Sequence, residues 1–314
     1  MKMGIIGLGH IARGMAYTIA HMREAEAYAV ASRDYGKACA FRDEFGFAIA
    51  YGTYEELIRD PQVELVYIAT PHAFHFVQAR MCLEYGKHVL CEKTLPQYLW
   101  QVEDLFPLAN KRGLFLMEAR MVPFMPLAKK LHQLAVEDKV IGEVMNLTAN
   151  YSYPLTHKER VMKQELAGGL MDIGIYLLEI ARLVFGDKER KVDTDMVITD
   201  TGLDGQAVIS LEYPGGKLAS LLYLIYALSD KKAVICGTEG CIEVQDINHL
   251  QELSVYDQAG NCIGRYHKPE QISDLSHELA AVIRAIESGS TECEELPQKE
   301  IMRVLKLLVG RSAQ

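Results

Sequence analysis

The sequence predicts an α/β protein of two domains. The first is a doubly wound parallel sheet, and the second is an α+β domain with a large, mostly antiparallel, open sheet. Up to about residue 118, short apolar segments alternate with helical patterns, whereas long strand-like stretches dominate the remainder. A chain of 314 residues is long enough for two domains, each with its own core. The pattern changes near 119–123, so we expect domains at 1–120 and 121–314.

The first half alternates strand and helix, as a parallel sheet with crossover helices on both faces requires. Strands are predicted at 2–6, 28–32, 47–51, 64–69, 88–91 and 114–118. Helices are predicted at 10–22, 35–45, 54–59, 73–85 and 97–112. The carboxyl ends of these strands should share one edge of the sheet.

The second half predicts a broad sheet interrupted by helices. Its strands are expected at 141–153, 192–199, 205–213, 217–227, 232–236, 240–245, 251–257 and 261–267. Turn signals, such as Pro214-Gly215-Gly216, separate neighbouring strands as in hairpins. Helices are expected at 124–137, 168–185, 274–288 and 297–310.

Composition excludes several classes of function. The net charge of −9 argues against a nucleic-acid surface, which needs a basic face. No apolar run approaches the length of a membrane span, and the chain enters its first strand directly, so we expect neither a membrane span nor a signal peptide. Seven cysteines without C-x-x-C spacing indicate free thiols in a reducing compartment. We therefore expect a cytoplasmic protein whose partner is a small molecule, not a nucleic acid or a membrane.

A glycine-rich turn follows the first strand and predicts a nucleotide site. Gly7 permits a tight turn, Gly9 lets phosphates approach the backbone, and Ala12 allows the following helix to pack closely. His10 and Ile11 begin that helix, whose N-terminal N–H groups would face a pyrophosphate. The alternative is an ordinary strand–helix turn. The position between strand and helix favours a Rossmann dinucleotide site.

The end of the second strand indicates which dinucleotide binds. NAD-binding units place an acidic residue here for the ribose 2′-hydroxyl, whereas this chain has Ser32 and Arg33. A guanidinium fork suits a 2′-phosphate, and Ser32 can add a hydroxyl donor. Alternatively, Arg33 is a surface charge and Asp34 is the ribose partner. We expect NADP(H) as the preferred cofactor, with NAD(H) as the alternative.

Polar and turn residues follow several strands of the first domain and should meet at one edge of the sheet. Beyond the first two strands, they are Thr70, Pro71, His72, Glu92, Lys93 and Glu118. Lys93 follows an apolar strand, so its ammonium group could orient a substrate hydroxyl or lower the pKa of a nearby phenol. The alternative for Lys93 is a solvated surface charge. The convergence of these residues predicts a catalytic domain.

Four motifs resemble those of one oxidoreductase family. They are the glycine fingerprint at 4–14, Thr-Pro-x-x-x-His at 70–75, Gly-Lys-His-Val-Leu-Cys-Glu-Lys at 86–93, and Gly-Gly-Leu-Met-Asp-Ile-Gly-Ile-Tyr at 168–176. Together they identify the chain as similar to the glucose–fructose oxidoreductase and inositol dehydrogenase (Gfo/Idh/MocA) family. Within it, residues 54–57 and 115–119 are most similar to the dimeric trans-1,2-dihydrobenzene-1,2-diol dehydrogenase branch.

The resemblance implies hydride transfer between NADP(H) and a secondary alcohol or its ketone, on a sugar, polyol or cyclic diol. It implies Tyr176 as the acid/base, Lys93 as the cation that tunes it, and Asp172 as an acidic residue of the active site. His75 would line the nicotinamide pocket. One alternative is an NAD-linked sugar or inositol dehydrogenase. Another is a catalytically silent, nucleotide-sensing regulatory protein.

Three further expectations concern the peptide after Lys93, metals and assembly. Thr94 replaces the proline of the family motif, which makes a cis bond after Lys93 less favoured and leaves its geometry open. His72 and His75 could share a helix face, but with no third ligand in reach we expect no metal site. The apolar strand around 218–225 predicts an exposed sheet face that a second copy covers, giving a homodimer or a higher homo-oligomer.

Overall fold

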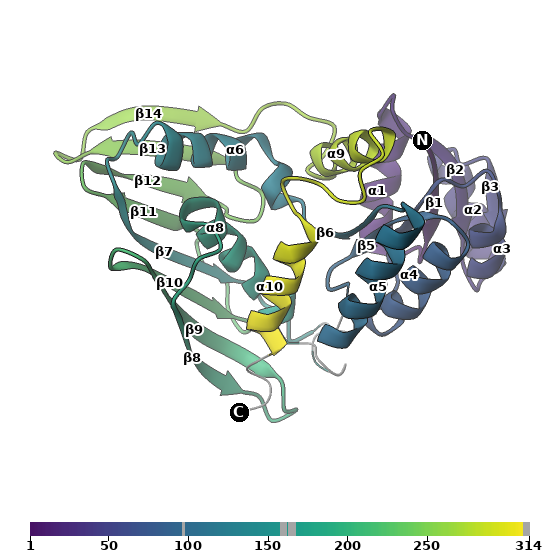
Figure 1. Cartoon of the computed structure of the whole chain (residues 1–314), viewed down its shortest axis with the longest axis horizontal. Helices are drawn as coiled ribbons and strands as arrows, with labels where there is room; N and C mark the ends of the chain where they lie inside the picture. The colour runs from purple at the N-terminus through teal and green to yellow at the C-terminus, as the bar shows by residue number, and fades with distance from the viewer. Residues whose placement is uncertain (96–97, 158–161, 163–167, 310–314) are drawn as a thin grey trace. The chain divides into compact units, whose positions relative to one another are not determined.

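The computed structural model describes residues 1–95, 98–157, 162 and 168–309 (Figure 1). Contacts within the chain divide it into two compact units. The first comprises Met1–Met121 together with Gln271–Gln314, and the second comprises Val122–Glu270. Each unit has a sheet of its own.

The sheet of the first unit has six strands in the order β3-β2-β1-β4-β5-β6, and all neighbouring pairs are parallel. The strands are β1 (Lys2–Ile6), β2 (Glu26–Ala31), β3 (Ile49–Tyr51), β4 (Leu65–Ile68), β5 (His88–Glu92) and β6 (Leu116–Ala119). The chain order reverses between β1 and β4. Ligands of open α/β sheets bind beyond the carboxyl ends of the strands at such a switch point. This topology confirms the predicted doubly wound fold.

Helices cross over between these strands. They are α1 (His10–His21), α2 (Tyr35–Phe45), α3 (Tyr54–Arg59), the short 3₁₀ turn η1 (His72–Phe74) with α4 (His75–Glu84), and α5 (Leu99–Arg112). Local chemistry sets their ends. The Thr53 hydroxyl and the Glu56 carboxylate form a capping box at the start of α3. Gly113, with φ of 64°, ends α5 in the left-handed conformation.

The last two helices, α9 (Leu275–Glu287) and α10 (Gln298–Val309), belong to the first unit. α9 contacts α1, and α10 contacts α5 (Figure 1). The hydroxyl oxygens of Thr18 and Ser273 lie 2.7 Å apart, and Asn110 donates a hydrogen bond to Gln298 at 3.0 Å. The sequence assigned residues 271–314 to the second domain. The contacts group them with the first, since α9 contacts α1 and α10 contacts α5.

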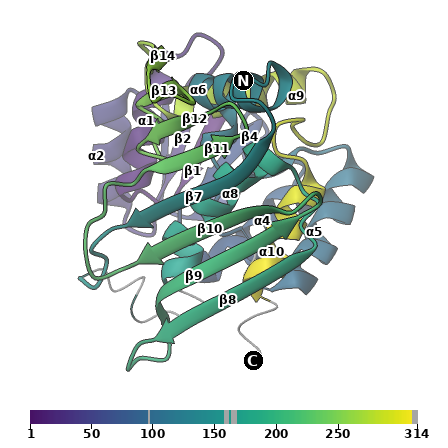
Figure 2. The same ribbon diagram turned by 90° about the vertical axis from the view of Figure 1, so that its left-hand side faces the viewer.

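The second unit contains a sheet of eight strands in the order β14-β13-β12-β11-β7-β10-β9-β8 (Figure 2). Only β7 and β10 pair in parallel, so the predicted, mostly antiparallel sheet is confirmed. The strands are β7 (Val144–Ser152), β8 (Lys191–Ile198), β9 (Asp204–Tyr213), β10 (Lys217–Leu224), β11 (Ala233–Gly237), β12 (Gly240–Gln245), β13 (Glu252–Asp257) and β14 (Cys262–His267).

Helical segments cover one face of this sheet. They are η2 (Val122–Phe124), α6 (Pro126–His132), the π-helical turns η3 (Gln133–Glu137) and η4 (Leu170–Gly174), and α8 (Ile175–Phe185). α8 contacts β7 and β10. Residues of β9 and β10 alternate between buried and exposed, as expected when one face of a sheet is covered.

Candidate active site

Gly7 brings the end of β1 against the end of β4. Its φ is +84°, and a Cβ atom there would lie 2.7 Å from the carbonyl carbon of Ala69 and the backbone nitrogen of Thr70. An L side chain would therefore be strained and would also collide with backbone. Glycine is required at this turn by the protein's own packing.

Gly9 stands in a different environment two residues later. It is the N-cap residue of α1 and, as a glycine, has no side chain that could cap the helix. A Cβ atom placed on it would have no neighbouring atom within 4 Å. His10 and Ile11 are exposed, whereas Ala12 is fully buried. The first turn of α1 has no acidic residue. Its backbone N–H groups and this open space therefore suit the pyrophosphate of a dinucleotide.

The loop after β2 separates the roles of Arg33 and Asp34. The Asp34 carboxylate accepts a hydrogen bond from the backbone N–H of Lys37 at 3.0 Å and so caps α2. The backbone N–H of Asp34 donates to the Ser32 hydroxyl at 3.2 Å. Arg33 is exposed and forms no ion pair with any residue in the described ranges. Its guanidinium is therefore available to a ligand, while the Asp34 carboxylate stabilises the helix.

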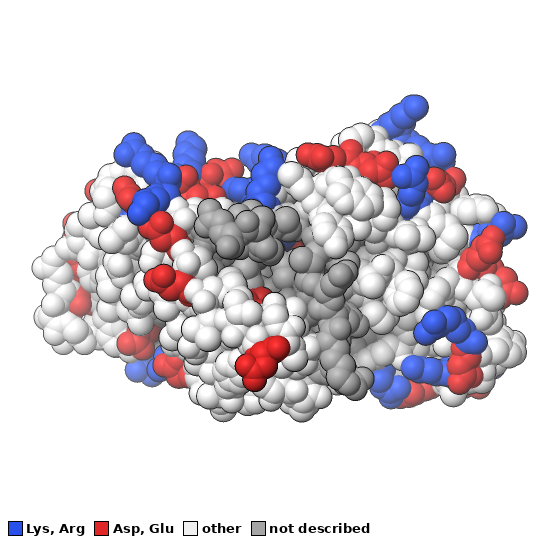
Figure 3. Space-filling view, turned by 90° about the horizontal axis from the view of Figure 1, so that it is seen from below, with Lys and Arg blue, Asp and Glu red and all other residues white. Residues whose placement is uncertain are grey.

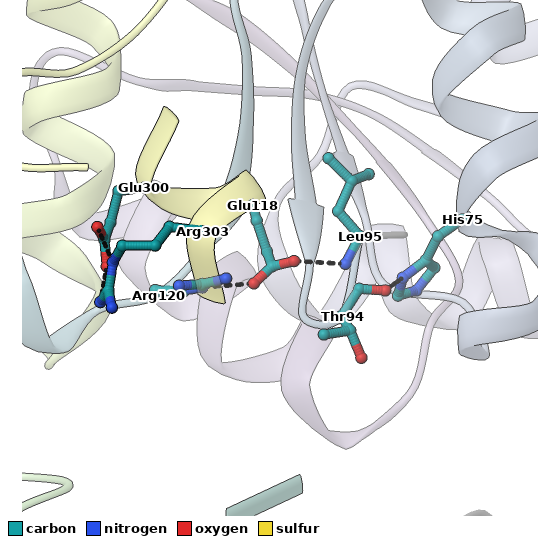
Figure 4. Close-up of polar contacts among 7 residues, drawn as sticks. All are labelled: His75, Thr94, Leu95, Glu118, Arg120, Glu300 and Arg303. Atoms are coloured by element: carbon teal, nitrogen blue, oxygen red, sulfur yellow. Dashed lines mark hydrogen bonds and ion pairs between the residues drawn. The ribbon is translucent and has the colours of Figure 1, made fainter. Parts of the chain in front are cut away.

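His75 links the loops that follow β4 and β5 (Figure 4). Its ring is fully buried, with Nε2 2.7 Å from the Thr70 carbonyl oxygen and Nδ1 3.1 Å from that of Thr94. Burial lowers the pKa of His75. The Thr70 hydroxyl also donates to Gln78 at 2.5 Å, whereas Pro71 is exposed and His72 is half-buried. The His75 ring lies within the loop cluster, where both nitrogens contact backbone.

Glu92 and Lys93 end β5. The Tyr67 hydroxyl donates a hydrogen bond to the Glu92 carboxylate, and burial raises the pKa of Glu92 while the positive charge of Lys93 opposes that shift. Lys93 is half-buried. The Lys93–Thr94 peptide is cis, although a threonine stands at the proline position of the motif.

Glu118 holds the segment that follows Lys93 from the neighbouring strand. Its carboxylate accepts the backbone N–H of Leu95 at 2.7 Å and also pairs with the guanidinium of Arg120 (Figure 4). Both side chains of this ion pair are almost completely buried. The sequence placed Glu118 at the correct sheet edge but assigned it no role. Glu118 and His75 together fix the backbone on the C-terminal side of Lys93.

In the second unit, the glycines of the 168–176 motif serve packing. A Cβ atom on Gly169 would lie 2.4 Å from the Tyr223 ring, and one on Gly168 would lie 2.1 Å from the Asp204 carboxylate. That carboxylate accepts the backbone N–H of Leu170 at 2.5 Å and the Tyr223 hydroxyl at 2.6 Å. Burial raises the pKa of both Asp204 and Tyr223. Sequence reasoning missed these two residues, which anchor η4 on β9 and β10.

Asp172 and Tyr176 are presented from this anchored segment. Asp172 lies in η4 and is buried, whereas Tyr176 lies in the first turn of α8 and is half-buried. The Tyr176 ring contacts the ring of Tyr151 edge-on, with centroids 5.4 Å apart and an interplanar angle of 83°. The four-residue spacing places Asp172 and Tyr176 on neighbouring positions of a helical surface. Lys93 belongs to the first unit, and these two residues belong to the second.

The described part of the chain contains no group of three or more His, Cys, Asp or Glu side chains positioned to hold a metal ion. Among the helices that the structure describes, none is long and apolar enough to span a membrane. The surface in Figure 3 carries both signs of charge.

Comparison with known families matches most of the chain in two segments. Residues 1–119 match the family described as "Oxidoreductase family, NAD-binding Rossmann fold", and residues 130–243 match the GFO/IDH/MocA C-terminal domain. The trans-1,2-dihydrobenzene-1,2-diol dehydrogenase of Mus musculus is 34% identical over 316 residues, which covers 98% of this chain and 95% of that protein. The Xenopus laevis protein of the same name is 36% identical over 77% of this chain and 74% of its own length.

Solved structures share the fold. The 3-ketoreductase KijD10 from Actinomadura kijaniata, in complex with NADP and TDP-benzene, superposes with a TM-score of 0.85 at 24% identity, covering 98% of this chain and 95% of that chain. An aldose–aldose oxidoreductase from Caulobacter crescentus, complexed with glycerol, superposes with a TM-score of 0.88 at 22% identity, covering 99% and 96%.

Proposed function

The chain belongs to the GFO/IDH/MocA oxidoreductase family, and from that premise we propose that it transfers a hydride between NADP(H) and a secondary alcohol or its ketone. The proposed substrate is a sugar, a polyol or a cyclic diol. The names of its relatives support this class, since they include dehydrogenases of a cyclic diol, a 3-ketoreductase and an aldose–aldose oxidoreductase.

The loop after β2 provides the main observation in favour of NADP(H). The Asp34 carboxylate caps α2, while the neighbouring Arg33 is exposed without an ion-pair partner in the described ranges. A 2′-phosphate would complete the hydrogen bonding of such a guanidinium. Charge-assisted hydrogen bonds of this kind contribute about 1.5–3 kcal/mol. NAD(H) would have to use an aspartate that already has a structural partner.

In the proposed mechanism, Gly7, Gly9 and the start of α1 would hold the pyrophosphate of the cofactor, whose nicotinamide would supply or accept the hydride. Reduction of a ketone leaves an alkoxide that needs a proton, which the Tyr176 hydroxyl donates. In the reverse direction the Tyr176 phenolate accepts that proton. A free phenol has a pKa near 10. In this proposal the positive charge of Lys93 would lower the pKa of Tyr176 toward neutrality. Asp172 would be a further acidic residue of the active site.

We also propose that the open face of the eight-stranded sheet is covered by a second copy of the chain. Leu218 and Leu222 of β10 are 50% and 39% exposed, and Leu222 is paired in register with Val208, which is 39% exposed. An apolar surface of this kind is typical of an interface. Light scattering should give about twice the monomer mass of 35.2 kDa, and the monomer mass at micromolar concentration would contradict the dimer.

A substrate panel tests the proposed reaction. Aldoses, cyclitols and cyclic trans-diols, with their ketones, would be incubated with each of the four nicotinamide cofactors while the absorbance of the reduced nicotinamide is followed. We expect turnover of at least one class, with a higher kcat/KM for the NADP(H) couple. A higher kcat/KM with NAD(H) would favour the NAD-linked alternative. Tight NADPH binding without any turnover would favour a regulatory protein.

A further inference from the structure

Three tyrosines and a lysine lie together in the second unit. The rings of Tyr151 and Tyr176 are in edge-on contact, as described above. The Lys231 ammonium nitrogen, just before β11, lies 5.7 Å from the Tyr151 ring centroid and 5.2 Å from that of Tyr153. The Tyr151 ring therefore lies between the Lys231 cation and Tyr176, the residue that we propose as the acid/base.

Asn248 adds a polar group to this cluster. Its side-chain amide donates a hydrogen bond to the Tyr151 hydroxyl at 3.0 Å. The residue is only 8% exposed, and its Oδ1 is buried without a hydrogen-bond partner in the described part of the chain. A buried amide oxygen without a partner is unfavourable. A ligand hydroxyl could supply that partner after a small rearrangement of the amide.

The backbone holds Lys231 in an uncommon conformation. Its φ is +56°, in the left-handed region that residues other than glycine seldom adopt. Two hydrogen bonds fix it there: its N–H donates to the Ser229 hydroxyl at 3.1 Å, and its carbonyl accepts the N–H of Ile247 at 2.9 Å. Backbone conformations of this kind persist only where the surrounding structure holds them in place, and they are concentrated at ligand sites.

The charge of Lys231 has no acidic partner within the described ranges, although the chain has a net charge of −9. The adjacent Asp230 carboxylate instead accepts a hydrogen bond from Asn150 at 2.7 Å. The tyrosine faces attract the ammonium group but do not neutralise it. Tyr153 is 39% exposed, so this end of the cluster is accessible from solvent.

We propose that Lys231 and Tyr153 form a subsite for an anionic group on the substrate, either a carboxylate or a phosphate, and that the Asn248 side-chain oxygen accepts a hydrogen bond from a hydroxyl of the same substrate. The Lys231 ammonium group would pair with the anion, and the tyrosine rings would pack against the carbon skeleton that joins it to the reacting hydroxyl. This inference rests on the proposed function, because it places the reacting end of the substrate at Tyr176. It narrows the substrate class to acidic sugars, acidic polyols or their phosphate esters.

Calorimetry on the full chain saturated with NADPH tests the subsite at constant ionic strength. Three matched probes differ in one group: glucose, glucuronate and glucose 6-phosphate. We expect at least one anion to bind about tenfold or more tightly than glucose, and the tighter of the two distinguishes carboxylate from phosphate. The Lys231→Met variant should lose that preference, a weakening of about 10- to 100-fold for the anion, with glucose binding unchanged.

Two further variants make the result specific. Lys231→Arg keeps the charge and should retain the preference. Lys232→Met removes the next lysine, which is outside the cluster, and should leave all three affinities unchanged. The proposal is overturned if neither anion binds more tightly than glucose, if Lys231→Met retains the preference, or if Lys232→Met abolishes it equally. Native NADPH affinity and thermal unfolding of Lys231→Met show that the variant is folded. Because no turnover is measured, failure of the proposed catalytic mechanism would leave this result unaffected.

Discussion

Gly9 of the first unit and Gly169 of the second serve opposite purposes. In the first unit, Gly9 faces open space at the start of α1, where a Cβ atom would meet nothing in the protein. In the second unit, Gly169 lies so close to the Tyr223 ring that a Cβ atom would be 2.4 Å from it. The first glycine leaves room for a ligand, and the second lets η4 pack on the sheet. The same residue type therefore leaves room for a ligand at Gly9 and allows internal packing at Gly169.

The units also present their polar groups differently. The first exposes backbone N–H groups and single side chains at the ends of parallel strands, a geometry suited to a dinucleotide. The second gathers side chains from separate strands and loops, such as Tyr151, Tyr176, Lys231 and Asn248. We infer that the first unit determines the cofactor and supplies Lys93, and that the second supplies the proposed acid/base and determines the substrate. The predictions below test this division, from the largest expected effect to the smallest.

Tyr176→Phe should have the largest effect on turnover. The substitution keeps the ring that contacts Tyr151 and removes only the hydroxyl, so NADPH affinity should be unchanged. Turnover should fall roughly 10²- to 10⁴-fold, the usual contribution of general acid–base catalysis. Steady-state kinetics on a substrate from the panel measure the loss, and the exposed Tyr85→Phe is the control. Near-native turnover would make Asp172 the next candidate for the proton donor.

Lys93→Met should also slow turnover, because Lys93 of the first unit is proposed to lower the pKa of the Tyr176 phenol in the second unit. Without the ammonium group, the pKa of the Tyr176 phenol rises, so the basic limb of the pH–rate profile should move to higher pH. The effects of Lys93→Met and Tyr176→Phe should not add in the double variant, because the two residues act on one proton. Additive losses, or an unmoved basic limb, would show that Lys93 does not tune Tyr176.

Three alanine substitutions separate binding glycines from packing glycines. Gly7→Ala and Gly169→Ala should each destabilise the protein by about 1–3 kcal/mol, because each Cβ atom collides with neighbouring atoms. Gly9→Ala should unfold at nearly the native temperature yet bind NADPH roughly tenfold or more weakly, since the collision is with the ligand. Calorimetric unfolding and NADPH titration measure both quantities. A strongly destabilised Gly9→Ala with native NADPH affinity would remove the distinction between binding and packing glycines.

The fold could be predicted from the sequence because its elements have strong local signals. The strands from β1 to β6 begin or end within about two residues of their expected positions, since apolar runs and glycine turns bound them. The placement of α9 and α10 was not predictable in this way. Their amphipathic pattern shows that one face is buried but does not show against which sheet it packs.

Site residues could be predicted from the sequence only where they directly follow a strand of the parallel sheet, because the ends of those strands share one edge. Gly7, Ser32, Arg33, Thr70 and Lys93 all follow strands of one parallel sheet, so their common edge could be inferred. Asp204, Tyr223, Lys231 and Asn248 had no such signal, because the fold of a mixed sheet and its loops brings them together. His75 was identified as a site residue, but its burial between two backbone carbonyl groups could not be inferred from a motif.

The most direct test of the cofactor assignment compares NADPH and NADH binding to the native protein and to Arg33→Ala, by titration of the reduced cofactors' fluorescence. Arg33 is exposed beside the capping residue Asp34, so its removal should not disturb the fold. Arg23→Ala, another exposed arginine, is the control. The native protein should prefer NADPH about 10- to 100-fold, and Arg33→Ala should lose most of that preference with NADH affinity almost unchanged. Equal native affinities for the two cofactors, or a preference that survives Arg33→Ala, would contradict the assignment.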